Sequence, residues 1–326
     1  MPVNDHIHFA ISLSGPGAGQ VLTDEAAIAD ALHQPDLAWL HLQADDPATP
    51  EFISRHLGYL DQTILSALTA LETRPRAFRH DDGLLVILRA ANVSPDQAPE
   101  DMVSLRLWLD PARLISLSRR PLAVVDRMMR GYEGDTTQTR SGALLCTLIT
   151  RIVEPIEQQL LSLEERTDSH ELSLSDPPDP ALRADIGDLR YQLTLLRRHI
   201  APQRDVLGEL SRSDVAWLTR KDRRNLHELH DRLIRVVEEL DEFRDRMVLL
   251  RDELTGMQSE RLNRNLYRLS IISVIFLPLG FLTGLLGVNL GGLPGANWPG
   301  AFWVFTGSLA GIGLCLLAIL LWRRWL

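Results

Sequence analysis

The sequence predicts an α+β membrane protein with an N-terminal cytoplasmic α/β domain, long coiled-coil-like helices and two C-terminal transmembrane helices. Two apolar runs near the C-terminal end predict the membrane part, because each has about the 20 residues that a helix needs to cross a hydrocarbon core. Apolar residues at three- and four-residue steps over 226–257 predict the long helix before them. Short apolar runs in the first 140 positions predict a sheet.

Residues 1–140 are interpreted as the cytoplasmic α/β domain. Strands are expected at 8–13 and 37–43, as a hairpin over 77–90 around an Asp-Asp-Gly turn, and as a second pair at 102–109 and 113–118. Helical patterns occupy 50–71 and 121–131. The strands are expected to form one sheet that helices cover.

Residues 141–212 are expected to form an antiparallel pair of cytoplasmic helices. Apolar side chains keep three-four spacing over 145–163 and again over 182–210, where Gln203 is the one polar member. The Asp-Pro-Pro-Asp-Pro segment at 176–180 must separate the two helices, because proline cannot continue a helix.

Residues 213–289 are interpreted as a long stalk helix that continues into the first transmembrane helix. Thr219 and Asp222 resemble a capping box at its start. The leucine-rich seam over 226–257 has the 3.5-residue period of a coiled coil. Such a seam needs a partner, and either oligomerisation or packing on the preceding helices would supply one.

The two spans carry no charge between Leu269 and Trp322. Arg261, Arg264 and Arg268 precede the first span, and Arg323 and Arg324 follow the second. The positive-inside rule therefore predicts cytoplasmic termini, an extracytoplasmic loop at 290–300, and a second transmembrane helix with its tail at 301–326.

One face of the first span carries small and polar residues among leucines. Steps of three and four place seven residues on this stripe: Gly284, Gly280, Leu277, Ser273, Leu269, Leu266 and Asn263. Small residues at this spacing permit close packing of membrane helices, and they would also suit the lining of a pore. The pattern by itself leaves both interpretations open.

The run FLPLGFLTGLLGVN at 276–289, with two C-terminal spans after a large cytoplasmic part, resembles the CorA family of divalent-cation transporters. That family ends its pore helix with Gly-Met-Asn, and this chain has Gly287, Val288 and Asn289 there. The valine, the uncharged loop and the segments WLHLQADDP and ETRPRAF resemble the zinc-transporting ZntB branch.

The resemblance implies a homopentamer in the bacterial inner membrane, with membrane lipid and divalent metal ions as partners. In such an assembly the first span surrounds a central pore whose mouth is at Asn289. Gly284 and Gly280 would then line a wider path, and Leu277, Leu269 and Leu266 would form hydrophobic constrictions. Zinc would be the transported ion, and no cofactor is expected.

Two histidine pairs are weaker metal candidates. His6 and His8 lie two apart in an expected strand, and His227 and His230 lie one turn apart on the stalk helix. Imidazole suits zinc, but a closed zinc site needs four ligands, and neither pair has a third histidine or a cysteine close in sequence.

The formal net charge of −9 argues against nucleic acid as a partner. The sequence has no phosphate-cradling glycine loop, nucleophile elbow or catalytic triad, which argues against an enzyme. Three hypotheses remain: a zinc transporter, with other divalent cations and proton coupling left open; a CorA-like magnesium, cobalt or nickel channel; and a non-conducting oligomeric membrane sensor.

Overall fold

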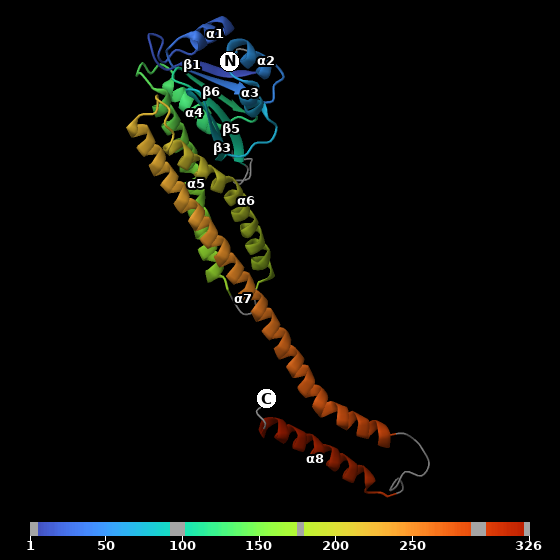
Figure 1. The fold of residues 1–326 in the computed structure, drawn as a ribbon. Coiled ribbons are helices and arrows are strands. Elements are labelled where there is room, and N and C mark those ends of the chain that lie inside the picture. The colour runs from blue at the N-terminus through green and yellow to red at the C-terminus, as the bar shows by residue number, and fades with distance from the viewer. Residues whose placement is uncertain (1–5, 92–101, 175–178, 288–297, 323–326) are drawn as a thin grey trace. The chain divides into compact units, whose positions relative to one another are not determined.

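The computed structural model describes residues 6–91, 102–174, 179–287 and 298–322 (Figure 1). The chain divides into two units at residue 251 of its longest helix. The first unit holds a sheet and a set of helices, and the second holds the apolar helices near the C-terminal end. Each unit is described by itself below.

A mixed six-stranded sheet forms the centre of the first unit, as predicted. Its spatial order is β1-β2-β6-β5-β4-β3, with β2 and β6 parallel and every other neighbouring pair antiparallel. The strands are β1 (Ile7–Ser12), β2 (Ala38–Gln43), β3 (Arg76–His80), β4 (Gly83–Ala91), β5 (Met102–Leu109) and β6 (Arg113–Ser118).

Helices cover both faces of this sheet. On one face, α1 (Glu25–His33), α2 (Ala48–His56) and α3 (Gln62–Thr69) contribute to the buried core, which includes Leu40 and Trp108 from the strands. On the other face, Trp39 of β2 meets Tyr132 of α4 (Ala123–Tyr132) edge to face, at 6.4 Å between ring centroids. Alternation along β2 therefore sends neighbouring side chains into two different helical layers.

The helix expected over 50–71 is two helices, α2 and α3. The chain leaves α2 at Leu57 and passes through Gly58 before Asp61 caps α3 by accepting a hydrogen bond from the Ile64 amide at 2.8 Å. Aspartate at an N-cap satisfies a donor that a helix start would leave unpaired, so the break is locally stable. Helix α1 lies outside the helical patterns recognised in the sequence.

Three helices follow the sheet: α5 (Ser141–Leu172), α6 (Pro180–Ser211) and the first part of α7 (Arg220–Leu286). Two ion pairs show the relative directions of α5 and α7. Arg232 pairs with Glu157 at 2.5 Å, and Arg246 pairs with Glu171 at 2.7 Å, so α5 and α7 run parallel. Helix α6 runs against both, as the predicted antiparallel pair requires (Figure 1).

The leucine-rich seam of α7 is buried inside a single chain between Leu226 and Leu250. Val236 and Leu240 converge with Ile156 and Leu160 of α5 and with Leu196 and Ile200 of α6. Packing on the preceding helices thus supplies the seam with its partner, and over this stretch the seam is not free to line an oligomer axis.

Polar contacts are made at the start of α7 and between α6 and the sheet. The predicted capping box forms: the Asp222 amide donates to Thr219 Oγ1 at 3.2 Å, and Asp222 Oδ2 accepts from the Thr219 amide at 2.9 Å. Gln203, the polar member of the α6 seam, accepts a hydrogen bond from the Arg89 amide at 2.6 Å. Its polarity is therefore explained by the backbone of β4.

Candidate ion pathway and metal-binding residues

Within the part of the chain that the structure describes, two helices are long and apolar enough to cross a membrane: the later part of α7 and α8 (Ala301–Trp322). They touch each other, since a Cβ placed on Gly313 of α8 would lie 3.7 Å from Leu279 Cδ1 of α7. The two helices therefore form a hairpin of spans within the second unit.

The span in α7 has two unlike sides. Ile271 is buried, and Ile275, Pro278, Leu279 and Leu282 are partly buried. The predicted stripe lies on the exposed side, with every described member exposed: Asn263, Leu266, Leu269, Ser273, Leu277, Gly280 and Gly284. Helix α8 thus covers a different side of α7 from the one that carries the stripe.

The small stripe residues have no packing partner in the described part of the chain. A Cβ added at Gly280 or Gly284 would meet nothing within 4 Å. Ser273 Oγ donates to the Leu269 carbonyl at 2.9 Å. This bond uses the hydroxyl hydrogen and leaves lone pairs on an exposed oxygen that can accept hydrogen bonds from water.

Gly287, the first residue of the signature, ends the helix. Its amide donates to the Thr283 carbonyl at 2.9 Å, and an added Cβ would lie 2.7 Å from that same oxygen. Glycine is thus required for the chain to close the last turn this tightly. Val288, Asn289, most of the loop predicted at 290–300 and the arginines after the second span lie outside the described residues.

His6, directly before β1, and His8, within β1, make different contacts. His6 packs on Phe52 of α2, with 5.4 Å between ring centroids. His8 stacks on His41 at 5.2 Å and bonds Gln43 at 2.8 Å. A β-bulge between Ile7 and Phe9 interrupts the strand alternation that would have placed both rings on one face.

The second pair, on α7, gains a third ligand that the sequence analysis missed. Potential ligand atoms of His227, His230 and Asp231 all lie within 4.8 Å of one another. His227 Nε2 is 3.9 Å from Asp231 Oδ2, and His230 Nδ1 is 3.5 Å from Asp231 Oδ1. These separations are close to the distance of about 3.3 Å expected between two ligand atoms of a tetrahedral zinc site. A search for carboxylates at the same helical spacing would have found Asp231.

Helix α6 orients one ring of this trio. A Cβ on Gly208 would lie 2.9 Å from His230 Nε2, so the ring sits against the glycine and turns Nδ1 toward Asp231. His230 Nδ1 is buried and makes no hydrogen bond. A metal ion would supply the interaction that this nitrogen lacks. With three protein ligands, water would complete the shell.

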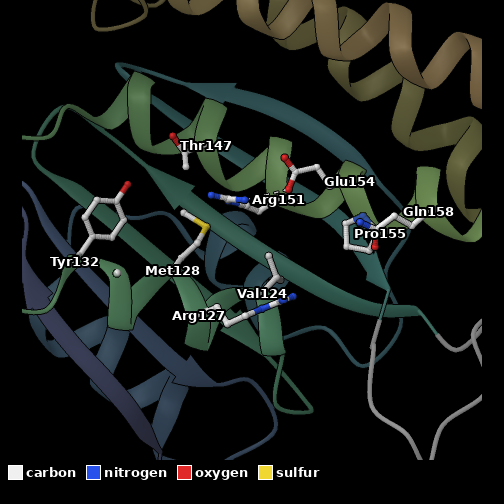
Figure 2. A pocket seen from close by; sticks show the side chains of 10 residues that line it. Val124, Arg127, Met128, Tyr132, Thr147, Arg151, Glu154, Pro155 and Gln158 are labelled. Atoms are coloured by element: carbon white, nitrogen blue, oxygen red, sulfur yellow. Dashed lines mark hydrogen bonds and ion pairs between the residues drawn. The ribbon is translucent and has the colours of Figure 1, made fainter.

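Other groups are poorer cation ligands. Burial, with the nearby charge of Asp222, raises the pKa of the Cys146 thiol to about 12, so the thiolate that zinc prefers is disfavoured. A hollow of about 500 Å³ between α4 and α5 is lined by Arg127, Arg151 and Glu154 (Figure 2). Its glutamate already pairs with Arg151 at 3.2 Å, and the net positive lining disfavours a cation.

A mixed sheet, a long helix and a hairpin of two candidate membrane spans together indicate an integral membrane protein. The family model described as "CorA-like Mg2+ transporter protein" matches residues 35–324. The chain belongs to this CorA family and is a divalent-cation transporter. The family consists of ion transporters and not of enzymes.

Two curated relatives are similar in sequence to this chain over most of its length. The zinc transport protein ZntB of Pectobacterium atrosepticum is 33% identical over 276 residues, which cover 85% of this chain and 84% of the relative. The divalent cation transporter CmaX of Pseudomonas aeruginosa is 35% identical over 323 residues, covering 96% and 95%.

Solved structures share the fold. Full-length CmaX matches with a TM-score of 0.82 at 31% identity, covering 99% of this chain and 98% of that one. The CorA magnesium transporter from Methanocaldococcus jannaschii matches with a TM-score of 0.75 at 21% identity, covering 89% and 92%. At that identity the second match speaks for the fold alone.

Proposed function

We propose that this chain forms a homopentamer in the bacterial inner membrane, with both termini cytoplasmic, and conducts zinc through a central pore lined by α7. The observation that carries the proposal is the exposed stripe of small and polar residues. It lies on a side of the span that α8 leaves uncovered, and a Cβ at Gly280 or Gly284 would contact none of the described residues within 4 Å. A lining around a shared axis accounts for both facts.

An uncharged lining limits the chemistry of this pore. No carboxylate occurs between Leu269 and Trp322, so the pore cannot replace the hydration shell of a divalent ion with charged ligands. The ion would keep water, and Asn289 amides at the mouth would hydrogen-bond that water. Ser273 would accept further hydrogen bonds along the path, and rings of Leu277, Leu269 and Leu266 would gate by dewetting.

Zinc is favoured over magnesium by two features of the sequence. Valine stands at position 288 of the signature, and no acidic residue follows it through Gly300. Several relatives are named zinc transport protein ZntB, which also favours zinc. The alternative is a CorA-like magnesium, cobalt or nickel channel. The name of the matching family model favours it, and CmaX is named only for divalent cations.

Flux into proteoliposomes separates these possibilities. Vesicles containing the purified full chain, and loaded with a zinc or magnesium indicator, are expected to show zinc entry that outpaces magnesium entry. A pH gradient of either sign then tests proton coupling. Magnesium entry with little zinc flux would support the alternative. A protein that passes neither ion would instead fit a membrane sensor.

We also expect His227, His230 and Asp231 to bind zinc in the first unit. Replacing Asp231 with Asn removes the negative charge of the carboxylate that faces both histidines, and it should weaken zinc binding at this site by tenfold or more. His230→Gln should act in the same direction. Isothermal titration of the full chain in detergent measures the effect.

The matched control is His33→Gln, an exposed histidine on α1 that bonds the Ala29 carbonyl at 2.7 Å. It should leave zinc affinity unchanged. Equal zinc affinity and stoichiometry in wild type and Asp231→Asn would show that this trio holds no metal.

A further inference from the structure

Arginine side chains gather around a hollow of about 270 Å³ in the first unit, where the chain after α3 crosses β5. We call it the arginine hollow. Its lining comes from the 71–73 segment, the two strands β4 and β5, and the residues that follow β2 and β6: Asp45, Leu71, Thr73, Arg89, Met102, Val103, Ser104, Arg106, Arg119 and Arg120. This hollow contains none of the residues assigned above to the ion pathway or the histidine trio.

Arg106 is the central member. It projects from β5, is 1% exposed, and donates from Nη2 to the Ala70 carbonyl at 2.8 Å. Its Nε and Nη1 atoms are buried without a hydrogen-bond partner. A buried charged donor that lacks a partner is destabilising, and such groups in native proteins are almost always satisfied by protein, water or a ligand.

Arg89 repeats this pattern on the neighbouring strand. It donates to the Thr73 carbonyl at 2.6 Å and to the Met102 carbonyl at 3.2 Å, and its Nε is buried without a partner. Carbonyl acceptors orient these guanidinium groups without neutralising their charge. Two fixed cations thus lie side by side on adjacent strands with donors still unused.

Three arginines of the described lining, Arg89, Arg106 and Arg119, have one described carboxylate among them, that of Asp45. This carboxylate lies 3.5 Å from Arg119 and also accepts a hydrogen bond from Gln43. Burial, followed by repulsion from Arg119 and Arg89, lowers the pKa of Arg106 to about 10. Arg106 therefore stays cationic at neutral pH in surroundings that do not compensate its charge.

Hydroxyl groups complete the wall. Thr73 Oγ1 and Ser104 Oγ lie 2.5 Å apart, so one hydroxyl donates to the other and the second keeps its hydrogen for another acceptor. Guanidinium groups and hydroxyl donors together match a tetrahedral oxyanion, because arginine forms paired, charge-assisted bonds to phosphate oxygens.

We propose that the arginine hollow binds a phosphate-sized oxyanion, either inorganic phosphate or the phosphoryl group of a small soluble molecule. Arg106 and Arg89 supply the central donors, Arg119 supplies further positive charge, and Thr73 or Ser104 supplies a hydroxyl. The anion satisfies buried donors that the fold otherwise leaves unpaired. This site is independent of which metal ion the protein transports.

The test uses the full chain in detergent and sodium phosphate as the probe. Thermal midpoints and isothermal titrations are compared with sodium chloride at matched ionic strength. Phosphate is expected to raise the midpoint beyond the chloride effect and to bind with measurable heat. A phosphorylated sugar run in parallel shows whether a phosphoryl ester binds more tightly than free phosphate.

Arg106→Met should weaken phosphate binding at least tenfold, and it should raise the midpoint without phosphate because an uncompensated buried charge is removed. Arg119→Met, at the half-exposed rim, should weaken binding several-fold and covers the case in which Arg106→Met does not fold. Arg130→Met, exposed on α4, is the matched control and should bind as the wild type does. Phosphate acting no differently from chloride, or binding undiminished in both hollow variants, would overturn the proposal.

Discussion

Zinc flux through Asn289→Ala is expected to fall at least tenfold below that of the wild-type chain in proteoliposomes. In the proposed pentamer, five amides at the pore mouth hydrogen-bond the water around the ion. One such bond contributes about 0.5–1.5 kcal/mol net. Since about 1.4 kcal/mol changes a rate tenfold, losing two of five bonds from the passing ion suffices for this effect.

Asn297→Ala is the matched control, because it removes the same kind of side-chain amide from the uncharged 290–300 segment, outside the Gly-Val-Asn signature. Its zinc flux should stay close to wild type. Both variants must reach the vesicles as intact oligomers, which chromatography of the solubilised protein checks. If Asn289→Ala transports zinc at the wild-type rate, the asparagine of the signature is not the selective mouth.

The second large effect is expected from Gly280→Phe, which should reduce the flux of every divalent ion at least tenfold. A Cβ at this position meets none of the described residues within 4 Å, so the side chain can leave the α7 backbone without a clash inside a single chain. Around a common axis, five phenyl rings would fill the path and exclude water. Metal uptake and the oligomeric state are measured on the same preparation.

Gly311→Phe on α8 supplies the comparison. Gly311 is also exposed and also has open space at its Cβ, but it lies on the span that is not expected to line the pore. A ring there faces lipid and should leave transport largely intact. Equal flux in Gly280→Phe and the wild type would mean that the stripe serves helix packing and that the pore lies elsewhere.

Much of the architecture could be predicted because its signals are local. The hairpin at Asp81 to Gly83, the capping box of Thr219 with Asp222 and the two charge-free spans each depend on residues close in sequence. The exposed stripe on α7 was also predictable, since helical geometry alone decides which residues share a face. Among these features, the strands follow a period of two residues and the helical stripe follows a period of 3.6 residues.

Other features of the fold depended on contacts between residues that are distant in sequence. The helical pattern over 50–71 did not reveal the break at Gly58, because apolar residues of both α2 and α3 belong to the same buried core. The β-bulge in β1 moved His6 and His8 to different neighbours. Asp231 joined the histidine pair through helical spacing, but only Gly208 on another helix explains the orientation of His230.

By itself, the sequence determined most strands, the long helices, the two spans and the family, because apolar periodicity and a short signature are encoded locally. Only the tertiary structure decided what each apolar or charged face contacts. The seam of α7 was free to pair with another subunit or with α5 and α6, and burial between Leu226 and Leu250 assigns it to its own chain. In the sequence, Arg106 is one more charged residue of a predicted strand. In the structure it is buried, and its guanidinium donates to the Ala70 carbonyl in the segment after α3. Burial depends on contacts distant in sequence, which no local pattern specifies.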